Sequence, residues 1–140
     1  MKITQAVVNN IKREIGSINV ESGGIIGSSG GIINTFVFDR KGDKGEYIPN
    51  TFYLNTILEE WSDTGIVFEG IIHSHMRNRF LSFSDKEYAD AICRVNNIDQ
   101  LYMLIYVLEE RQIFAYRYIC GLSNTNSEAS VYKESIIIEV

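Results

Sequence analysis

The chain has 140 residues, 45% of them hydrophobic and 22% charged, a composition typical of one folded domain and not of a disordered or fibrous chain. Its formal net charge of −5 argues against a broad surface for phosphates or nucleic acid. The chain contains no run of eighteen uncharged apolar residues, so the sequence predicts no helix that spans a membrane.

Hydrophobic spacing predicts helices and strands in the first half of the chain. Ile3, Val7, Ile11 and Ile15 recur every four residues and Gly16 follows them, as in an amphipathic helix with a glycine cap. A second set of apolar residues recurs at helical spacing after residue 51. The expected elements are a helix over 3–15, strands over 25–26 and 32–38 with a turn at 28–31, a turn at 40–45, a short strand at 47–48, and a helix that opens at 49–51 and ends at 63–65.

The second half predicts mostly strands, with one helix among them. The expected elements are a strand over 66–75, a helix over 84–95, strands over 101–108 and 112–119 joined by a turn at 109–111, a polar loop over 121–130, and a terminal strand over 131–140. We find no internal repeat and no linker between domains. We therefore expect one α/β domain over residues 1–140, with helices packed on a mixed, largely antiparallel sheet.

The cysteines and the first residues of the chain bear on its compartment. Cys93 and Cys120 are the only cysteines; two cysteines make no disulfide framework, so we expect two buried thiols. Polar residues follow Met1 closely in place of an apolar segment, so we expect no cleaved secretory signal. The sequence therefore predicts a cytoplasmic protein.

The only two histidines, His73 and His75, lie two residues apart at the end of the strand expected over 66–75. Residues two apart on a strand point to the same face, so both imidazoles project together and could supply half of a zinc site. Ser74 points to the opposite face, and we assign it a structural role. Taken alone, the histidine pair favours a simpler interpretation, two polar residues at the exposed end of a strand.

The segment 82–87 predicts the start of a helix and a buried carboxylate. Ser82 with Asp85 matches a helix-capping box. Ser84 with Glu87 matches one as well, and one helix start needs only one cap. We assign the cap to this second pair, which places Asp85 at the first helical position and leaves Ser82 free. Asp85 then faces inward, where an unpaired carboxylate would cost several kcal/mol, so it needs a partner such as a metal ion.

Glu21 heads the glycine-rich apolar segment ESGGIIG. A position directly before an apolar strand is a poor place for a charge that serves only solubility. This makes Glu21 a candidate functional carboxylate. The segment alone favours that interpretation no more than a carboxylate on a loop or an edge strand.

Together these segments resemble the JAMM (MPN+/Jab1-Pad1) zinc metalloprotease family, and a small stand-alone domain resembles its prokaryotic branch. The family motif is a glutamate before a glycine-rich first strand, then His-x-His, a gap of about seven residues, and Ser-x-x-Asp. Here ESGGIIG begins at Glu21, GIIHSH ends at His75 and SFSD begins at Ser82. The order of the expected helices and strands also fits the family over most of the chain.

The chain departs from this family in the loop between the second histidine and the serine. The family usually has proline directly after the histidine and another just before the serine, where this chain has Met76 and Leu81. The gap is also one residue shorter than usual. The missing prolines predict a less pre-organised loop. Every group that the chemistry needs is present, so we expect a divergent but active member.

The resemblance implies a cytidine-deaminase-like MPN/JAMM fold and a role for each matched residue. His73, His75 and Asp85 would be the three protein ligands of one Zn²⁺ per chain, with water in the open fourth position of a catalytic site. Glu21 would hold that water and act as general base. Ser82 would donate a hydrogen bond to the oxyanion of the tetrahedral intermediate.

The resemblance also implies a reaction and a partner. The family cleaves amide or isopeptide bonds, often after the Gly-Gly tail of ubiquitin or of a ubiquitin-like sulfur carrier. The expected partner is a protein with an extended C-terminal tail, which could pair with an exposed strand edge; neither nucleic acid nor a membrane is expected. Two alternatives remain: a non-catalytic interaction module with an exposed apolar patch in a protein assembly, and a zinc enzyme that hydrolyses small-molecule amides.

Overall fold

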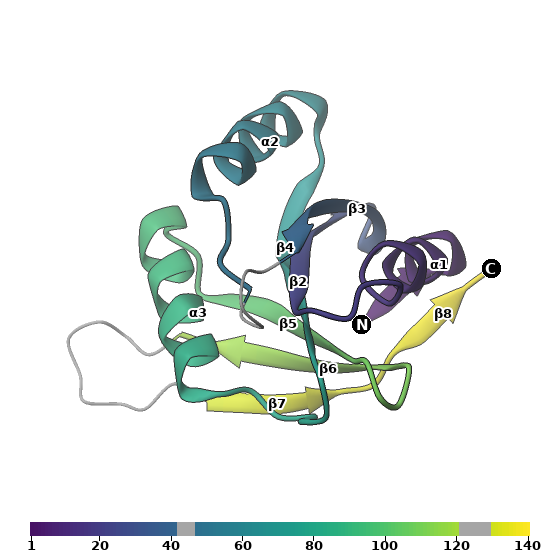
Figure 1. Ribbon diagram of the computed structural model, residues 1–140. Coiled ribbons are helices and arrows are strands. Elements are labelled where there is room, and N and C mark those ends of the chain that lie inside the picture. The colour runs from purple at the N-terminus through teal and green to yellow at the C-terminus, as the bar shows by residue number, and fades with distance from the viewer. Residues whose placement is uncertain (42–46, 121–129) are drawn as a thin grey trace.

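The described part of the computed structural model, residues 1–41, 47–120 and 130–140, forms one eight-stranded sheet and three helices (Figure 1). Most of the predicted turn at 40–45 and of the predicted loop over 121–130 lies outside these residues. The elements are, in chain order, β1 (Lys2–Thr4), α1 (Gln5–Glu14), β2 (Ser22–Ser29), β3 (Ile32–Lys41), α2 (Thr51–Thr64), β4 (Val67–His75), α3 (Phe83–Asn96), β5 (Gln100–Val107), β6 (Gln112–Ile119), β7 (Ser130–Glu134) and β8 (Ile137–Glu139).

The strands lie in the order β7-β6-β5-β4-β2-β3-β1-β8. Four neighbouring pairs are antiparallel and three are parallel, which confirms the predicted mixed, largely antiparallel sheet. β7 and β8 follow each other in the chain yet lie at opposite ends of this order, so the sheet must curl to bring its two edges near each other. The amino group of Met1 donates to the carbonyl of Ser135 at 3.1 Å, which ties β1 to the short connection between the edge strands.

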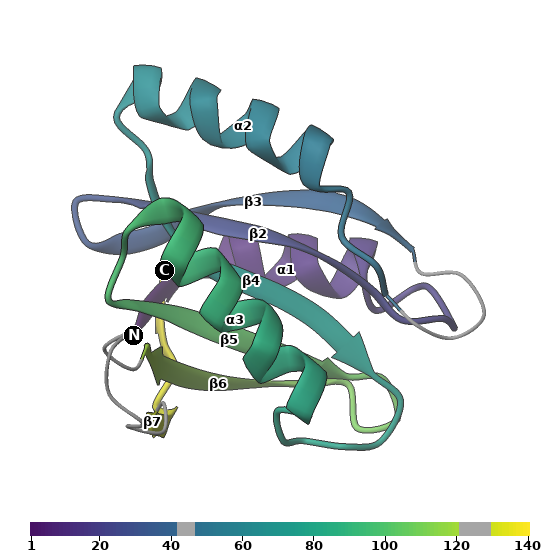
Figure 2. The same ribbon diagram turned by 90° about the vertical axis from the view of Figure 1, so that its left-hand side faces the viewer.

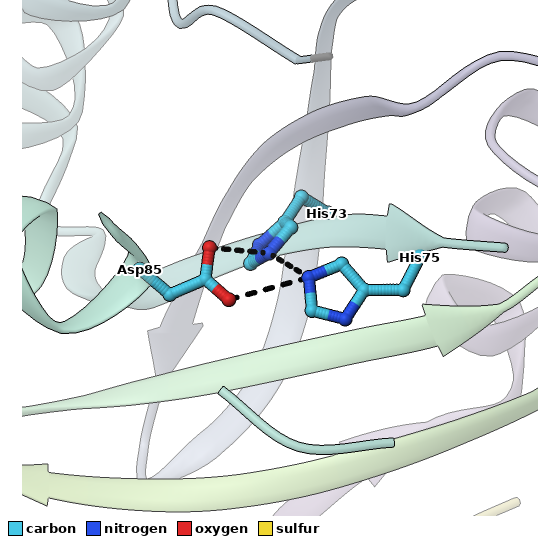
Figure 3. A group of neighbouring side chains, drawn as sticks. All are labelled: His73, His75 and Asp85. Atoms are coloured by element: carbon cyan, nitrogen blue, oxygen red, sulfur yellow. Dashed lines mark hydrogen bonds and ion pairs between the residues drawn. The ribbon is translucent and has the colours of Figure 1, made fainter. Parts of the chain in front are cut away.

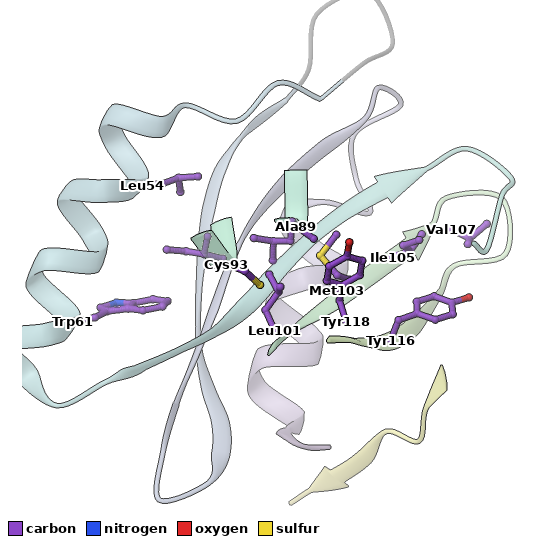
Figure 4. Close-up of a cluster of buried hydrophobic side chains, with 12 residues drawn as sticks. Leu54, Trp61, Ala89, Cys93, Leu101, Met103, Ile105, Val107, Tyr116 and Tyr118 are labelled. Atoms are coloured by element: carbon purple, nitrogen blue, oxygen red, sulfur yellow. The ribbon is translucent and has the colours of Figure 1, made fainter. Parts of the chain in front are cut away.

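A hydrophobic core lies on each face of the sheet. Figure 2 shows α1 behind the sheet and α3 in front of it. The core under α1 includes Val7, Ile11, Ile15, Ile26, Ile33, Ile72 and Leu104. The core under α2 and α3 is drawn in Figure 4 and includes Leu54, Trp61, Ala89, Cys93, Leu101, Met103, Ile105, Val107, Tyr116 and Tyr118.

The side-chain alternation along β4 decides which core its residues enter. Ile72 packs in the core under α1, and Ile71 packs in the core under α2 and α3. His73 and His75 have the same parity as Ile71, so they project on the side of α2 and α3. This confirms that the two imidazoles share one face. Ser74 lies on the other face, fully buried, where its hydroxyl accepts from the Ser22 N–H at 3.0 Å, the structural role predicted for it.

The first helix begins later than the spacing predicts. Ile3 belongs to β1, which pairs in parallel with both β3 and β8. Thr4 is the N-cap of α1, and its hydroxyl accepts from the Val7 N–H at 3.2 Å. β1 leads directly into α1, and Ile3 is buried in the same core as Val7 and Ile11. The four-residue interval between Ile3 and Val7 therefore resembles helical spacing although Ile3 lies in a strand.

Two other predicted elements also differ from the structure. No strand forms at 47–48, because the Tyr47 hydroxyl and the Asn50 N–H both donate to Oδ2 of Asp39, at 2.6 and 2.9 Å, and fix this segment as a loop. The terminal strand is divided into β7, which pairs with β6, and β8, which pairs with β1. The second helix is confirmed: Asn50 caps its start, and Gly65 ends it with a positive φ of 78°.

The two cysteines are bonded to each other, so the prediction of two separate thiols is wrong. Cys93 on α3 and Cys120 just after β6 form a disulfide across 27 positions of the chain. Among the described residues, no helix combines the length and the apolarity needed to cross a membrane.

Candidate metal centre

The end of β4 and the start of α3 bring two histidines and a carboxylate together (Figure 3). Nε2 of His73 lies 3.0 Å from Oδ1 of Asp85, and Nε2 of His75 lies 3.2 Å from Oδ2. The two Nε2 atoms are 3.0 Å apart. Both histidines are buried and Asp85 is largely buried. The three ligand atoms lie within 4.8 Å of one another and could hold a metal ion.

His75 is oriented by contacts on both sides of its ring. Nδ1 of His75 lies 2.9 Å from the carbonyl oxygen of Asn78. A carbonyl can only accept, so Nδ1 carries the proton and Nε2 is available as a ligand atom. Burial lowers the pKa of His75, but the hydrogen bonds to Asp85 and to the Asn78 carbonyl outweigh it and raise this pKa above its usual value. The contacts thus fix the direction of the ring, with Nδ1 on the Asn78 carbonyl and Nε2 toward Asp85.

Asp85 is held by the cap of α3, which the sequence analysis assigned to other residues. Ser82, and not Ser84, is the N-cap, and Asp85 is the third residue of the helix and not the first. The Ser82 N–H donates to Oδ2 of Asp85 at 2.8 Å, in a capping box. Although burial raises the pKa of Asp85, hydrogen bonds from His73 and His75 hold it well below its usual range. The carboxylate is therefore ionised and aimed at the imidazoles.

The Ser82 hydroxyl is engaged in capping, so the prediction that it is free is wrong. Its Oγ accepts from the Asp85 N–H at 3.1 Å and lies 3.1 Å from Oγ of Ser84. A hydroxyl that accepts one hydrogen bond still has its own proton to donate. Ser82 is therefore a cap with one remaining donor at the edge of the candidate metal site.

Glu21, the residue directly before β2, lies at the same site. Gly23 pairs with His73 in the antiparallel β2–β4 ladder, and Glu21 lies two residues before Gly23 and lines the same cavity as His75. Burial raises the pKa of Glu21, and the charges of His75 and His73 and a backbone hydrogen bond from Tyr47 partly oppose that shift. Glu21 is thus a partly buried carboxylate next to the two imidazoles.

All five residues singled out by the sequence motif line one cavity of about 730 Å³. The sequence pattern did not find two further neighbours of the site, Tyr47 and Asn78. The Tyr47 ring stacks near His73 with 6.5 Å between the ring centroids. No sequence signal marks either residue. Tyr47 contacts the site only through its ring, and Asn78 contacts it through a backbone carbonyl, which every residue has. The full lining is Glu21, Tyr47, Ile48, Pro49, Ile71, His73, His75, Met76, Arg77, Asn78, Ser82, Ser84, Asp85 and Tyr88.

Solved structures share this fold. No protein-family model and no curated protein matches the chain. The solution structure of protein DSY2949 from Desulfitobacterium hafniense is similar with a TM-score of 0.70 and 18% identity, covering 99% of this chain and 92% of that one. The crystal structure of AF2198, a JAB1/MPN domain protein from Archaeoglobus fulgidus, gives a TM-score of 0.53 and 15% identity, covering 83% of this chain and 88% of that one. The protein therefore has an MPN-like fold, a single α/β domain whose curled mixed sheet is flanked by three helices.

Proposed function

We propose that this protein is a zinc-dependent hydrolase of the JAMM type, which cleaves an amide or isopeptide bond at the C-terminal tail of a ubiquitin-like or sulfur-carrier protein. The observation that carries the proposal is the convergence of His73, His75 and Asp85 in a cavity that also contains Glu21 and Ser82. An MPN-like fold is compatible with this function.

The donor set fits zinc. Two imidazole nitrogens and a carboxylate oxygen are typical zinc ligands, and a catalytic site uses three protein ligands and leaves one position open. Within the described ranges, the group of possible ligands comprises His73, His75 and Asp85 alone. The Asn78 carbonyl on Nδ1 of His75 leaves Nε2 for the metal, the usual arrangement around a zinc-bound histidine. When bound there, zinc supplies a Lewis acid that polarises the substrate carbonyl and acidifies water.

Glu21 is the proposed general base. Its carboxylate lies at the cavity and takes a proton from the attacking water, which it then returns to the leaving amine. Burial raises its pKa, which improves a carboxylate as a proton acceptor because a base works best with a pKa near the working pH.

Ser82 is the proposed oxyanion donor. Its hydroxyl accepts from the Asp85 N–H, so the hydroxyl oxygen has a fixed position and its proton can turn toward the cavity. A donor that is already in place stabilises the negative charge of the tetrahedral transition state without reorganisation. Ser82 can therefore cap the helix with its oxygen atom and donate its proton to the oxyanion at the same time.

Apolar side chains at the cavity mouth support a protein substrate over a small molecule. Ile48 and Met76 line the cavity and are 62% and 49% exposed. Phe83, 78% exposed, lies in the chain between the cavity residues Ser82 and Ser84, and Phe80, 67% exposed, lies two residues before Ser82. Exposed apolar groups gathered at one place are typical of protein-binding surfaces. A folded carrier could rest on them while its tail enters the cavity.

The same exposed phenylalanines also favour a second candidate, a non-catalytic interaction module in a protein assembly. Such a module would bind its partner through this surface without cleaving it. The two functions differ in whether the bound partner is changed.

Zinc-loaded protein should be incubated with a panel of ubiquitin-like and sulfur-carrier proteins joined through the Gly-Gly tail to a reporter amine, and cleavage should be followed by mass spectrometry. We expect cleavage after the second glycine, loss of activity with a chelator, and recovery with Zn²⁺. Carriers without the Gly-Gly tail are the control and should stay intact. Binding of a carrier without cleavage, at full zinc occupancy, would support the interaction module instead.

A further inference from the structure

The loop between β4 and α3, residues 76–81, is fixed by contacts that replace the missing prolines. At its start, the Leu108 N–H donates to the His75 carbonyl at 2.9 Å and the Glu109 N–H donates to the Met76 carbonyl at 3.1 Å. Inside the loop, the Phe80 N–H donates to Oδ1 of Asn78 at 2.9 Å. These hydrogen bonds hold the folded loop in place without the two prolines.

The middle of the loop is attached to β6. The hydroxyl of Tyr116 donates to the carbonyl oxygen of Arg79 at 2.5 Å. Tyr116 is only 6% exposed and belongs to the core under α3, so its hydroxyl has a well-defined position. The guanidinium of Arg79 adds a second attachment, with Nη2 and Nε at 2.8 and 3.2 Å from Oε1 of Glu110 and Cζ 5.2 Å from the Phe114 ring centroid.

The attached peptide adjoins the one that orients His75. The Asn78 carbonyl that accepts from Nδ1 of His75 and the Arg79 carbonyl held by Tyr116 belong to consecutive residues. Holding the Arg79 carbonyl on β6 therefore restricts the rotation of the Asn78 peptide. The contacts therefore run without interruption from β6 to the metal site: the Tyr116 hydroxyl holds the Arg79 carbonyl, and the preceding Asn78 carbonyl holds the ring of His75.

We propose that Tyr116 is a positioning residue for the metal site, which acts through the Arg79 and Asn78 carbonyls to set the ring of His75. This inference rests on the proposed zinc site. Partners of a ligand that do not touch the metal typically change its affinity by about 10- to 100-fold. We therefore expect Tyr116→Phe, which removes one oxygen atom and keeps the ring, to weaken zinc binding by about tenfold.

Tyr118→Phe is the matched control. Tyr118 lies on the same strand, is 1% exposed in the same core, and donates its hydroxyl to Oδ1 of Asp90 at 2.8 Å. This change also removes one partly buried tyrosine hydrogen bond, here to α3 and not to the loop. It should cost at least as much stability, because its acceptor is a carboxylate, and it should leave zinc affinity unchanged.

Two measurements on the whole protein test the proposal: zinc affinity by competition with a coloured chelator, and hydrogen–deuterium exchange of residues 76–82 in the metal-free protein. In Tyr116→Phe we expect faster exchange in this segment together with weaker zinc binding. Arg79→Met, a surface change that spares the core, should speed exchange in the same segment. Normal zinc affinity in Tyr116→Phe, whether or not the loop exchanges faster, would overturn the positioning role. A wild-type protein with a protected loop and no zinc affinity would instead refute the proposed function.

Discussion

Ser82 and Asp85 show that one pair of residues can cap a helix and build a site at the same time. Each donates a backbone N–H to the other's side chain, and the side chains keep further capacity toward the cavity. Asp85 uses both carboxylate oxygens on the histidines. The sequence analysis treated capping and chemistry as exclusive and therefore moved the cap to Ser84 and Glu87. The structure removes that conflict.

Ser82→Ala should lose two properties together. Without the N-cap hydroxyl, the free energy of unfolding should fall by about 1 kcal/mol, and without the donor, turnover should fall by about 100-fold. Zinc content should stay normal, because Asp85 keeps its backbone contact with residue 82. Chemical denaturation and steady-state kinetics measure the two losses, and Ser82→Thr, which retains a hydroxyl, should restore most of both. A loss of stability with normal turnover would restrict Ser82 to capping.

Glu21→Gln should remove hydrolysis and leave the site intact. Glutamine keeps the size of the side chain but cannot take up a proton, so kcat should fall by about 10²- to 10⁴-fold with little change in KM. Zinc content, measured on the same samples, should match the wild type. Glu87→Gln, on the exposed face of α3, is the control and should change neither quantity. If Glu21→Gln loses its zinc, Glu21 is a ligand and the site is of another kind.

Among single residues, those with a reactive side chain at a distinctive spacing could be predicted from the sequence. Glu21, His73 and His75 stand out by type and spacing, and the structure brings them to one cavity. Asn78 could not be found, because it contacts His75 by its backbone carbonyl, which every residue has. Tyr116 could not be found either, since its partner lies 37 positions away.

At the scale of elements, close packing of β4 against β5 carries the histidines into place. Gly70 pairs with Tyr102 in the parallel β4–β5 ladder, and a Cβ at Gly70 would overlap the Tyr102 backbone carbonyl. Backbone atoms in the middle of a sheet cannot move aside without separating the strands. Gly70 therefore allows β4 to pack closely against β5, and this packing positions His73 and His75.

Gly70→Ala should destabilise the protein by about 3 kcal/mol, at the upper end for an overpacked buried position, as measured by chemical denaturation. Gly65→Ala is the comparison. Gly65 ends α2 with a positive φ of 78° and has open space where a Cβ would stand, so its cost should be only about 1 kcal/mol for the left-handed conformation. Equal losses in both variants would mean that β4 and β5 can separate easily.

Elements whose own residues carry a regular pattern were predictable. β4, β5 and β6 follow apolar runs, and α2 has a cap at both ends. β1 was not found, because a three-residue strand is defined by the strands that it joins. β8 was predicted only as part of one terminal strand over 131–140. The division of the terminal strand reflects two different partners, β6 and β1, which local sequence cannot reveal.

At the scale of the molecule, the curled sheet gives each face a core and leaves the site where β2, β4 and α3 meet. The core under α1 closes one face. On the other face, the core under α2 and α3 ends at the histidines, which therefore lie at its border with the cavity. The fold thus places two imidazoles in a buried but accessible position, where unpaired polar groups would be costly and a metal ion would satisfy them.

The zinc content of the purified protein is the most direct test of this account. After zinc is re-added and the excess is removed, elemental analysis should find one zinc per chain in the wild type. His75→Ala and Asp85→Ala should lose it. Asp90→Ala, a change of another aspartate on α3 that binds Tyr118, should keep it. A wild-type protein without zinc, or full occupancy in Asp85→Ala, would contradict the metal site built from His73, His75 and Asp85.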